Sequence, residues 1–200
     1  MLKATEEKKR SKKAEITNAI IEAATPLIKN QTFTKISIQD FCEKAGITTG
    51  MFYRHFKTKN DLLAVVYNVE NKKAIEQLME EIAEKPLEEQ LVRYSMTLCK
   101  SSEILGPDGL LMYLHSDESD QLCEELRDEM EKNVGRILEQ SEKNGEKLPE
   151  NKTAGMISDD IALLLKGATF EWYSWRDRFQ MAHTMESVFR RFMPAILYNE

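Results

Sequence analysis

The side chains best suited to binding an anion lie between residues 35 and 59 of this 200-residue chain. Tyr53 and His55 can donate hydrogen bonds to phosphate oxygens, and Lys59 opens a helix whose free N–H groups also favour an anion. Polar and basic residues that can reach phosphates or base edges complete this set: Lys35, Ser37, Lys44, Thr48, Thr49, Gly50, Arg54 and Lys57. These residue types predict a surface that binds nucleic acid.

The residues needed for catalysis or metal binding do not form a recognisable pattern. The three histidines, His55, His115 and His183, are dispersed, and the chain has no Glu-x-x-His pair, Gly-rich phosphate loop or serine nucleophile motif. Asp159 and Asp160 are adjacent on an expected helix, where neighbours do not face each other. We therefore expect no catalytic site, metal or cofactor, although an enzyme built on the acidic helical part stays an alternative.

The anion-binding set falls on two short helices joined by a tight turn. Ser37 and Asp40 fit a capping box that starts a helix over residues 38–44, and Gly46 suits the left-handed exit from it. Thr48 or Thr49 can cap a second short helix that ends at His55. Its inner face is predicted to pack on neighbouring helices through Phe52 and Phe56, against Ile16, Ile20, Ile38 and Phe41. The outer face contains no acidic residue, as expected for a recognition helix in a major groove.

Helical periodicity continues through the chain, and no strand-like alternation of useful length occurs. We expect an all-α fold of about nine helices. A capping pattern from Thr58 to Asp61 starts a long helix, and further helices are predicted after Pro86, after Ser116, over 153–176 and over 181–198. The predicted organisation is a basic flexible tail over 1–10, a helix-turn-helix domain over 11–60 and an effector-binding and dimerisation domain over 61–200.

The distribution of charge separates the same two parts. The net charge of the whole chain is -6, which taken alone argues against nucleic acid as a partner. Residues 1–60 carry 12 Lys+Arg and 6 Asp+Glu, a net +6, whereas residues 61–200 carry 16 and 28, a net -12. A basic front is thus joined to an acidic back, which confines the contact with DNA to the front.

Cysteine usage and the N-terminus indicate a cytoplasmic protein without a membrane segment. Cys42, Cys99 and Cys123 are odd in number and far apart, so neither a disulfide framework nor a zinc ribbon is expected. The charged N-terminus has no apolar run like that of a signal peptide, and no stretch approaches the roughly 20 apolar residues that span a bilayer. A redox role for any of the cysteines stays open.

The segment from Ser37 to Leu63 resembles the DNA-binding signature of TetR-family transcriptional regulators. The matching residues read Ala-Gly-Ile-Thr-x-Gly, then Phe-Tyr-x-His-Phe, then a Lys and a Leu at fixed offsets, and the resemblance covers about residues 12–65. It implies an all-α homodimer, with the family's phosphate-binding Tyr, His and Lys at Tyr53, His55 and Lys59. Its cap and glycine positions map onto Thr48 and Gly50. Phe41-Cys42 departs from the smaller pair usual in the family, which alters the packing between the short helices.

The remaining part is rich in aromatic and sulfur-containing residues, which suit a mostly apolar ligand cavity. The predicted ligand-binding residues are Tyr94, Cys99, Met112, His115, Phe170, Glu171, Tyr173 and Trp175, with His115, Glu171 and Arg176 as polar handles. Broad apolar stripes on the last two helices predict an isologous dimer face of Leu164, Leu165, Ala168, Val188, Phe189, Phe192, Met193 and Ile196. For both sets the alternative is that the residues fill the core of the monomer.

These features predict a ligand-responsive transcriptional regulator. As a repressor, a homodimer would hold two recognition helices on a near-palindromic operator of double-stranded DNA. A small, largely apolar effector would release the repressor from the operator by favouring another spacing between the two helix-turn-helix domains of the dimer. A helical enzyme and a ligand-independent DNA-binding protein are the alternatives, and a regulator of this kind can also be an activator.

Overall fold

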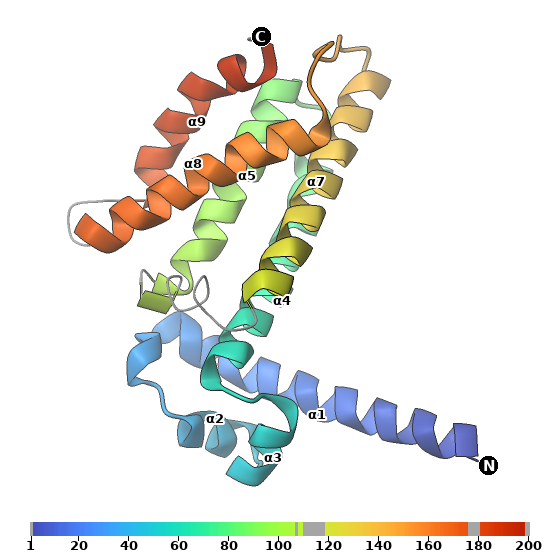
Figure 1. The fold of residues 1–200 in the computed structure, drawn as a ribbon, viewed down its shortest axis with the longest axis vertical. Helices are drawn as coiled ribbons and strands as arrows, with labels where there is room; N and C mark the ends of the chain where they lie inside the picture. Colours follow the sequence, from blue (N-terminus) through green and yellow to red (C-terminus); the bar gives the residue numbers. More distant parts are fainter. Residues whose placement is uncertain (1, 107, 110–118, 176–180, 199–200) are drawn as a thin grey trace. The chain divides into compact units, whose positions relative to one another are not determined.

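The computed structural model describes residues 2–106, 108–109, 119–175 and 181–198, and within these ranges every regular element is a helix. The all-α prediction is confirmed. The elements are α1 (Leu2–Asn30), the short 3-10 helix η1 (Phe33–Lys35), α2 (Ile38–Ala45), α3 (Thr49–His55), α4 (Lys59–Ile82), α5 (Leu87–Glu103), α7 (Ser119–Lys143), α8 (Ala154–Trp175) and α9 (Met181–Tyr198). Figure 1 shows their order along the chain. Ser116, after which a further helix was predicted, lies outside the described residues.

The chain divides into two compact units. Residues 1–68 and 104–116 form the first unit, and residues 69–103 and 117–200 form the second. Helix α4 therefore begins in the first unit and ends in the second. The predicted boundary at residue 60 separates a DNA-binding domain from an effector-binding domain, whereas the two units are defined by packing alone. The predicted boundary therefore stays a prediction.

The first unit is built on α1, against which α2 and α3 pack. Ile20, Phe41, Phe52 and Phe56 are buried at this junction, as predicted. Ile16 and Ile38, which were predicted to pack there too, are half-buried. Phe52 also stacks edge-on with Tyr53, with ring centroids 5.5 Å apart. Helices as short as α2 and α3 are unstable alone in water, so this shared core is what holds them.

Helix α1 occupies most of the segment that was predicted to be a flexible tail. The flexible tail over 1–10 is corrected, because the helix begins at Leu2. The physical reason lies in the composition of this segment: Ala, Glu, Lys and Arg are strong helix formers, and Glu6 and Arg10 have the i,i+4 spacing that favours a helix. A basic composition is typical of a disordered tail, but it is equally compatible with a helix.

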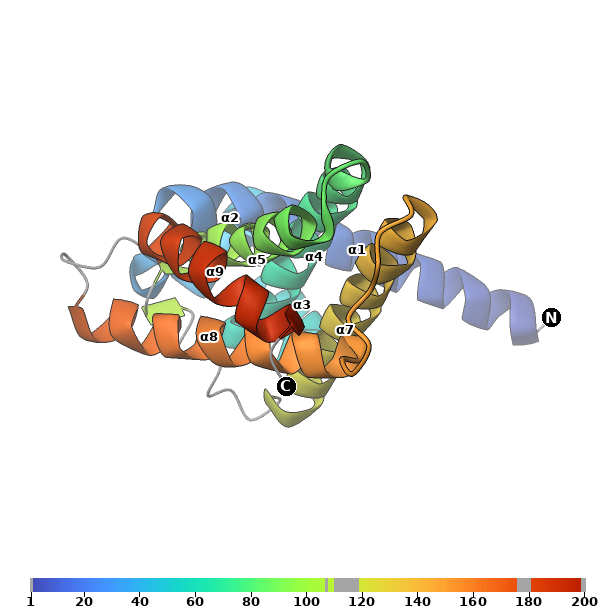
Figure 2. The same ribbon diagram turned by 90° about the horizontal axis from the view of Figure 1, so that it is seen from above.

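The second unit is a bundle in which α5 packs on α9 and α7, and α8 packs on α7 and α9 (Figure 2). Its core is a single apolar cluster with fully buried Leu91, Tyr94, Val134, Ile161 and Phe189. No helix among the described residues is both long enough and apolar enough to cross a membrane.

Polar contacts between distant residues fix the ends of this bundle. Glu146 accepts the backbone N–H of Leu87 at 3.0 and 3.1 Å, so a loop carboxylate caps α5. In the same way, Glu103 accepts the backbone N–H of Ala182 at 3.0 Å and caps α9. Each carboxylate satisfies a helix-end donor that has no partner in its own helix.

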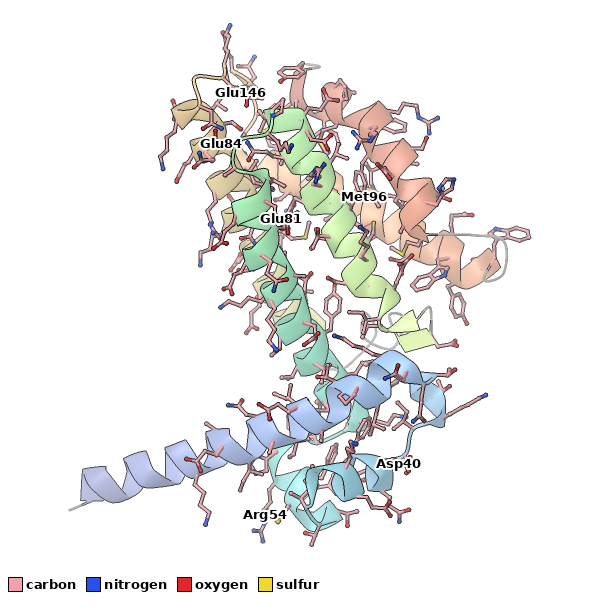
Figure 3. All side chains as sticks on the ribbon, turned by 180° about the vertical axis from the view of Figure 1, so that it is seen from behind. Asp40, Arg54, Glu81, Glu84, Met96 and Glu146 are labelled. Carbon is pink, nitrogen blue, oxygen red and sulfur yellow. The ribbon has the colours of Figure 1, made fainter. Side chains whose placement is uncertain are left out.

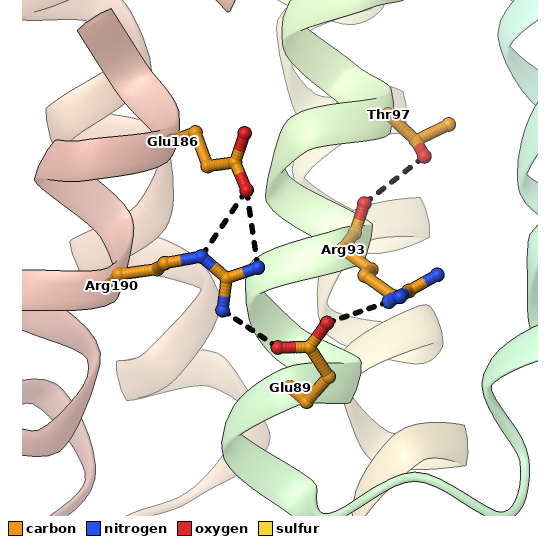
Figure 4. Close-up of polar contacts among 5 residues, drawn as sticks. All are labelled: Glu89, Arg93, Thr97, Glu186 and Arg190. Atoms are coloured by element: carbon orange, nitrogen blue, oxygen red, sulfur yellow. Dashed lines mark hydrogen bonds and ion pairs between the residues drawn. The ribbon is translucent and has the colours of Figure 1, made fainter. Parts of the chain in front are cut away.

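An ion-pair network joins α5 to α9 on the surface (Figure 4). The carboxylate of Glu89 accepts hydrogen bonds from Arg93 Nε and Arg190 Nη1, both at 2.7 Å, and Arg190 also contacts Glu186. Hydrogen bonds from Arg190 and Arg93 lower the pKa of Glu89. Because the arginines are exposed, each pair contributes at most about 1 kcal/mol.

Candidate nucleic-acid interface

The turn between α2 and α3 is fixed by its own sequence. Ser37 Oγ accepts the backbone N–H of Asp40 at 3.2 Å, and the Asp40 carboxylate accepts the backbone N–H of Ser37 at 2.6 Å. This is the predicted capping box. The Ser37 backbone and side-chain hydrogen bonds lower the pKa of Asp40. At the other end of α2, Gly46 adopts φ 65°, a left-handed conformation that a glycine takes without strain.

Helix α3 presents one exposed face and one buried face. Thr48 is the N-cap, accepting the backbone N–H of Met51 at 3.2 Å, while Phe52 is buried against α1 and α2. The exposed side carries Thr49, Gly50, Tyr53 and Arg54, with Tyr53 55% exposed. Figure 3 shows Arg54 projecting outward from this unit. The structure thus places Thr49, Gly50, Tyr53 and Arg54, all predicted to bind DNA, on one acid-free face of α3.

Gly50 is not required by packing within the chain. A Cβ at this position would meet only Thr48 Oγ1, at 4.0 Å, and the residue is exposed. Glycine inside a helix costs about 1 kcal/mol relative to alanine. The glycine therefore favours a function at the surface of α3, such as close approach of another molecule to the backbone.

His55 lies at the C-terminal end of α3 and is half-buried against α1. Its Nδ1 is 2.8 Å from the hydroxyl of Thr17, which itself donates to Lys13 O at 2.9 Å. Because a hydroxyl has one hydrogen, the His55 Nδ1–H is the donor to Thr17, and Nε2 of the neutral ring is an acceptor. Burial, together with the charge of Lys13, lowers the pKa of His55.

Lys59, at the first position of α4, is engaged within the chain. Its Nζ donates to Phe33 O at 2.6 Å and to Ile36 O at 2.5 Å, and it lies 4.2 Å from the centroid of the Phe33 ring. Burial lowers the pKa of the ammonium, an effect that Asp40 opposes. Two of its three N–H donors thus hold η1, a role that the sequence analysis missed.

The remaining predicted DNA-binding residues lie in the same unit. Lys35, Lys44 and Lys57 are exposed, whereas the hydroxyl of Ser37 is engaged in the capping box. A second predicted capping box is present at the start of α4, where Thr58 and Asp61 bond reciprocally at 2.8 and 3.2 Å. Contact of any of these residues with DNA stays a prediction.

The predicted ligand-binding residues are not brought together into one buried site. Tyr94 and Cys99 are fully buried in the core of the second unit, but the four predicted residues on α8 are exposed: Phe170, Glu171, Tyr173 and Trp175. Binding of a ligand by any of these residues stays a prediction. Met112, His115 and Arg176 lie outside the described residues.

The predicted dimer face stays a prediction, and the structure buries part of it within the monomer. Ala168, Phe189, Met193 and Ile196 are buried in the monomer's own core, and Leu164, Leu165 and Val188 pack against that core. Of the eight predicted residues, only Phe192 is an exposed large apolar residue, at 43%. The stripes on α8 and α9 are wide, and their central residues are used to close the bundle.

A different apolar surface remains exposed on the same two helices. Leu163 is 70% exposed and Phe170 is 65% exposed, with the bare backbone of Gly167 between them on one face of α8. On α9, Phe192 and Tyr198 are exposed. We call the surface formed by Leu163, Gly167, Phe170, Phe192 and Tyr198 the α8/α9 surface. Helical periodicity in the sequence could not predict this surface, because periodicity does not show which side of an apolar stripe faces the core.

Two short helices around a left-handed glycine, with an exposed acid-free second helix, define the chain as a helix-turn-helix protein. The family model for bacterial regulatory proteins of the tetR family matches residues 20–66, which span this motif.

The curated "Fatty acid metabolism regulator protein" of Bacillus subtilis (strain 168) is 27% identical over 108 residues, which cover 54% of this chain and 55% of that protein. The match thus spans about half the length of the curated relative.

Solved structures share the whole fold. The Bacillus subtilis regulator FadR, in complex with stearoyl-CoA, has a TM-score of 0.65 at 18% identity and covers 90% of this chain and 98% of its own. A candidate TetR-family transcriptional regulator from Syntrophomonas wolfei has a TM-score of 0.63 at 20% identity, covering 92% and 95%. Residues 20–66 are therefore similar to the tetR family of bacterial regulatory proteins, and the chain shares the fold of these solved structures.

Proposed function

We propose that this chain is a ligand-responsive repressor that binds a near-palindromic operator as a homodimer. The observation that carries the proposal is the exposed surface of α3, where Thr49, Gly50, Tyr53 and Arg54 share one acid-free face. Tyr53 and Arg54 provide hydrogen-bond donors, and Gly50 allows close approach to the backbone. Because the operator is chromosomal DNA, the protein acts in the cytoplasm.

A second copy of the chain is the proposed partner of the α8/α9 surface. Exposed Leu163, Phe170 and Phe192 give this surface an apolar character that a water-exposed helix pair rarely has. In a two-fold dimer the same patch occurs on both subunits, so Leu163 and Gly167 would approach their own counterparts. The absent side chain of Gly167 permits a close crossing of the two α8 helices.

The proposed effector is a small, largely apolar fatty acyl compound that binds the second unit. Support comes from the apolar core of this unit and from the curated relative, whose name links it to fatty acid metabolism. The likeness to the stearoyl-CoA complex, at 18% identity, supports the fold and only suggests the ligand class. Release of DNA would follow from a higher affinity of the effector for the conformation that does not fit the operator.

The alternatives differ from this proposal in a measurable way. An enzyme built on the acidic helices would convert its ligand, and a ligand-independent DNA-binding protein would show no change in melting temperature with any effector. An activator would bind the same DNA but raise transcription from it.

The test is a gel-shift titration of the purified chain against the intergenic DNA upstream of its own gene, with and without stearoyl-CoA. We expect a sequence-specific complex at moderate salt that stearoyl-CoA dissociates, and lower transcription from that promoter in a reporter strain. Absence of a sequence-specific complex would refute the proposed DNA binding. A complex that stearoyl-CoA does not dissociate would refute only the proposed effector class.

A further inference from the structure

Helix α1 packs against the first unit along only part of its length. Ile20, Ala24 and Ile28, in its C-terminal part, are buried in the core of that unit. Residues 12–15, by contrast, are all exposed. Four consecutive helical residues face all sides of one turn, so no side of α1 is covered at this turn. Figure 1 shows α1 running on towards the N-terminus beyond α2 and α3. We call residues 2–13 the α1 extension.

The α1 extension carries most of the net positive charge of the first 60 residues. It contains six Lys+Arg and two Asp+Glu, a net +4, whereas residues 14–60 contain six and four, a net +2. Five of its six cations lie in the run Lys-Lys-Arg-Ser-Lys-Lys over residues 8–13, which no acidic residue interrupts. The helix-turn-helix therefore supplies only the smaller share of the charge that attracts an anionic partner to this unit.

The α1 extension begins beside the C-terminal end of α3. His55 Nδ1 lies 2.8 Å from the hydroxyl of Thr17, and that hydroxyl donates to Lys13 O at 2.9 Å. Burial and then the positive charge of Lys13 lower the pKa of His55. The last cation of the extension is thus close to the residue that ends the predicted recognition helix, so the two basic surfaces are neighbours.

Helical register relates the cations of the extension to this junction. Arg10, Lys13 and Thr17 have i, i+3, i+7 spacing, so they occupy one face of α1. At 1.5 Å per residue, the extension continues for about 16 Å beyond Lys13. Because a duplex rises about 3.4 Å per base pair, this length corresponds to about five base pairs.

The composition of the extension suits a phosphate backbone better than a lipid surface. A helix that lies in a membrane surface needs large apolar residues that insert between the lipids. Leu2 is the only apolar residue of the extension larger than alanine, and it stands at the far end from the cationic run. Lysine and arginine on an uncovered helix can instead bind phosphates without any insertion.

We propose that the α1 extension is a second DNA-contacting element, whose cations bind phosphates of the duplex beside the base pairs that α3 contacts. These contacts carry no sequence information, so they raise the affinity for every duplex and make that affinity more dependent on salt. This inference rests on the proposed function, because it takes DNA as the partner of the first unit. It adds contacts outside the helix-turn-helix.

The test is a triple variant, Lys8→Gln with Lys9→Gln and Lys12→Gln, in the full-length chain. Glutamine has nearly the helix propensity of lysine, so the charge is removed and the helix is retained. Fluorescence anisotropy measures binding to the upstream intergenic DNA and to a random duplex at four or more salt concentrations. Each phosphate contact contributes about -0.9 to the slope of log K against log salt concentration.

We expect the magnitude of the slope to fall by at least about 1.8, which corresponds to one phosphate in each subunit of a dimer. Affinity for the two duplexes should fall by the same factor, about tenfold or more at moderate salt. The melting temperature should stay unchanged, because the turn over residues 12–15 packs against nothing in the first unit.

The matched control removes three exposed lysines of the second unit: Lys100→Gln with Lys132→Gln and Lys143→Gln. This variant has the same net charge as the first triple variant and should keep the wild-type slope. An equal change of slope in both triple variants would show that only net charge matters, and would overturn the inference. An unchanged slope in the first variant would overturn it too, including the case in which wild-type protein binds phosphatidylglycerol vesicles and the variant does not.

The two duplexes separate this inference from the proposed function. If wild-type protein does not prefer the intergenic DNA over the random duplex, the proposed function fails, and the slopes on the random duplex still decide the inference. If wild-type protein binds the intergenic DNA specifically and the first triple variant keeps its slope, the proposed function stands and the inference fails. If wild-type protein binds neither duplex at low salt, both fail.

Discussion

Lys59 is the residue whose role the structure most directly redefines. Its ammonium donates to Phe33 O at 2.6 Å and to Ile36 O at 2.5 Å, and it lies over the Phe33 ring at 4.2 Å. Lys59→Met retains the apolar stem but removes these interactions. Hydrogen bonds to charged groups contribute about 1.5–3 kcal/mol each, and solvent around the ammonium reduces that sum. We expect a loss of about 2 kcal/mol in the stability of the first unit.

The effect on DNA binding distinguishes positioning from phosphate contact. Each phosphate neutralised by a cation contributes about -0.9 to the slope of log K against log salt concentration. If Lys59 bound a phosphate in each subunit of a dimer, Lys59→Met would reduce the magnitude of the slope by about 1.8. Because two of its donors are bound to carbonyls, we expect an unchanged slope and a uniform loss of affinity for specific and non-specific DNA.

The measurement is fluorescence anisotropy of labelled operator DNA at four or more salt concentrations, with thermal melts of the same samples. Lys44→Met is the matched control, since Lys44 is exposed on α2 and its predicted phosphate contact should change the slope. A reduction of about 1.8 in the slope for Lys59→Met, with an unchanged melting temperature, would show that the positioning argument is wrong.

Three further predictions concern the recognition helix, its histidine and the α8/α9 surface. Gly50→Ala should raise the stability of the first unit by up to about 1 kcal/mol in urea unfolding and yet weaken operator binding; a variant that binds normally would remove the reason for a glycine there. His55 has a lowered pKa, so the folded state disfavours its protonation and should lose stability as pH falls below about 6.5. Because Nδ1–H donates to Thr17, Nε2 can donate to a phosphate only when the ring is protonated. Operator affinity should therefore rise from pH 8 to pH 6 in the wild-type protein, and rise less in His55→Gln. Identical pH profiles of the two proteins would contradict the hydrogen-bond assignment to Thr17. Leu163→Glu should convert a dimer into a monomer, measured as the molar mass in light scattering. Lys132→Glu, at an exposed position of α7, should leave the mass unchanged. An unchanged mass for Leu163→Glu would place the dimer face elsewhere.

Local features could be predicted well because each depends on residues close together in the sequence. The Ser37 and Thr58 capping boxes and the left-handed Gly46 need only neighbours three or four positions away. The buried side of α3 followed from the i,i+4 spacing of Phe52 and Phe56. The tail over 1–10 was mispredicted because a basic segment of good helix formers is equally typical of a disordered arm.

The unequal burial of the predicted residues in the second unit has one physical cause. Periodicity shows that one side of α8 or α9 is apolar, but it does not show what covers that side. Phe189 and Met193 are fully buried, while Leu163 and Phe170 are exposed, and all four had the same apolar character in the sequence. Only packing against α5 and α7 decided between core and surface.

The sequence by itself determined the helix-turn-helix, its caps and the acid-free face of α3, since short-range hydrogen bonds and helical spacing specify them. It also determined the separation of charge between the basic front and the acidic back. The tertiary structure alone decided the engagement of Lys59 by Phe33 and Ile36, and the contact of Thr17 with His55. These features arise between residues more than 20 positions apart, where the partner of a side chain is set by how the helices pack and not by the order of the residues.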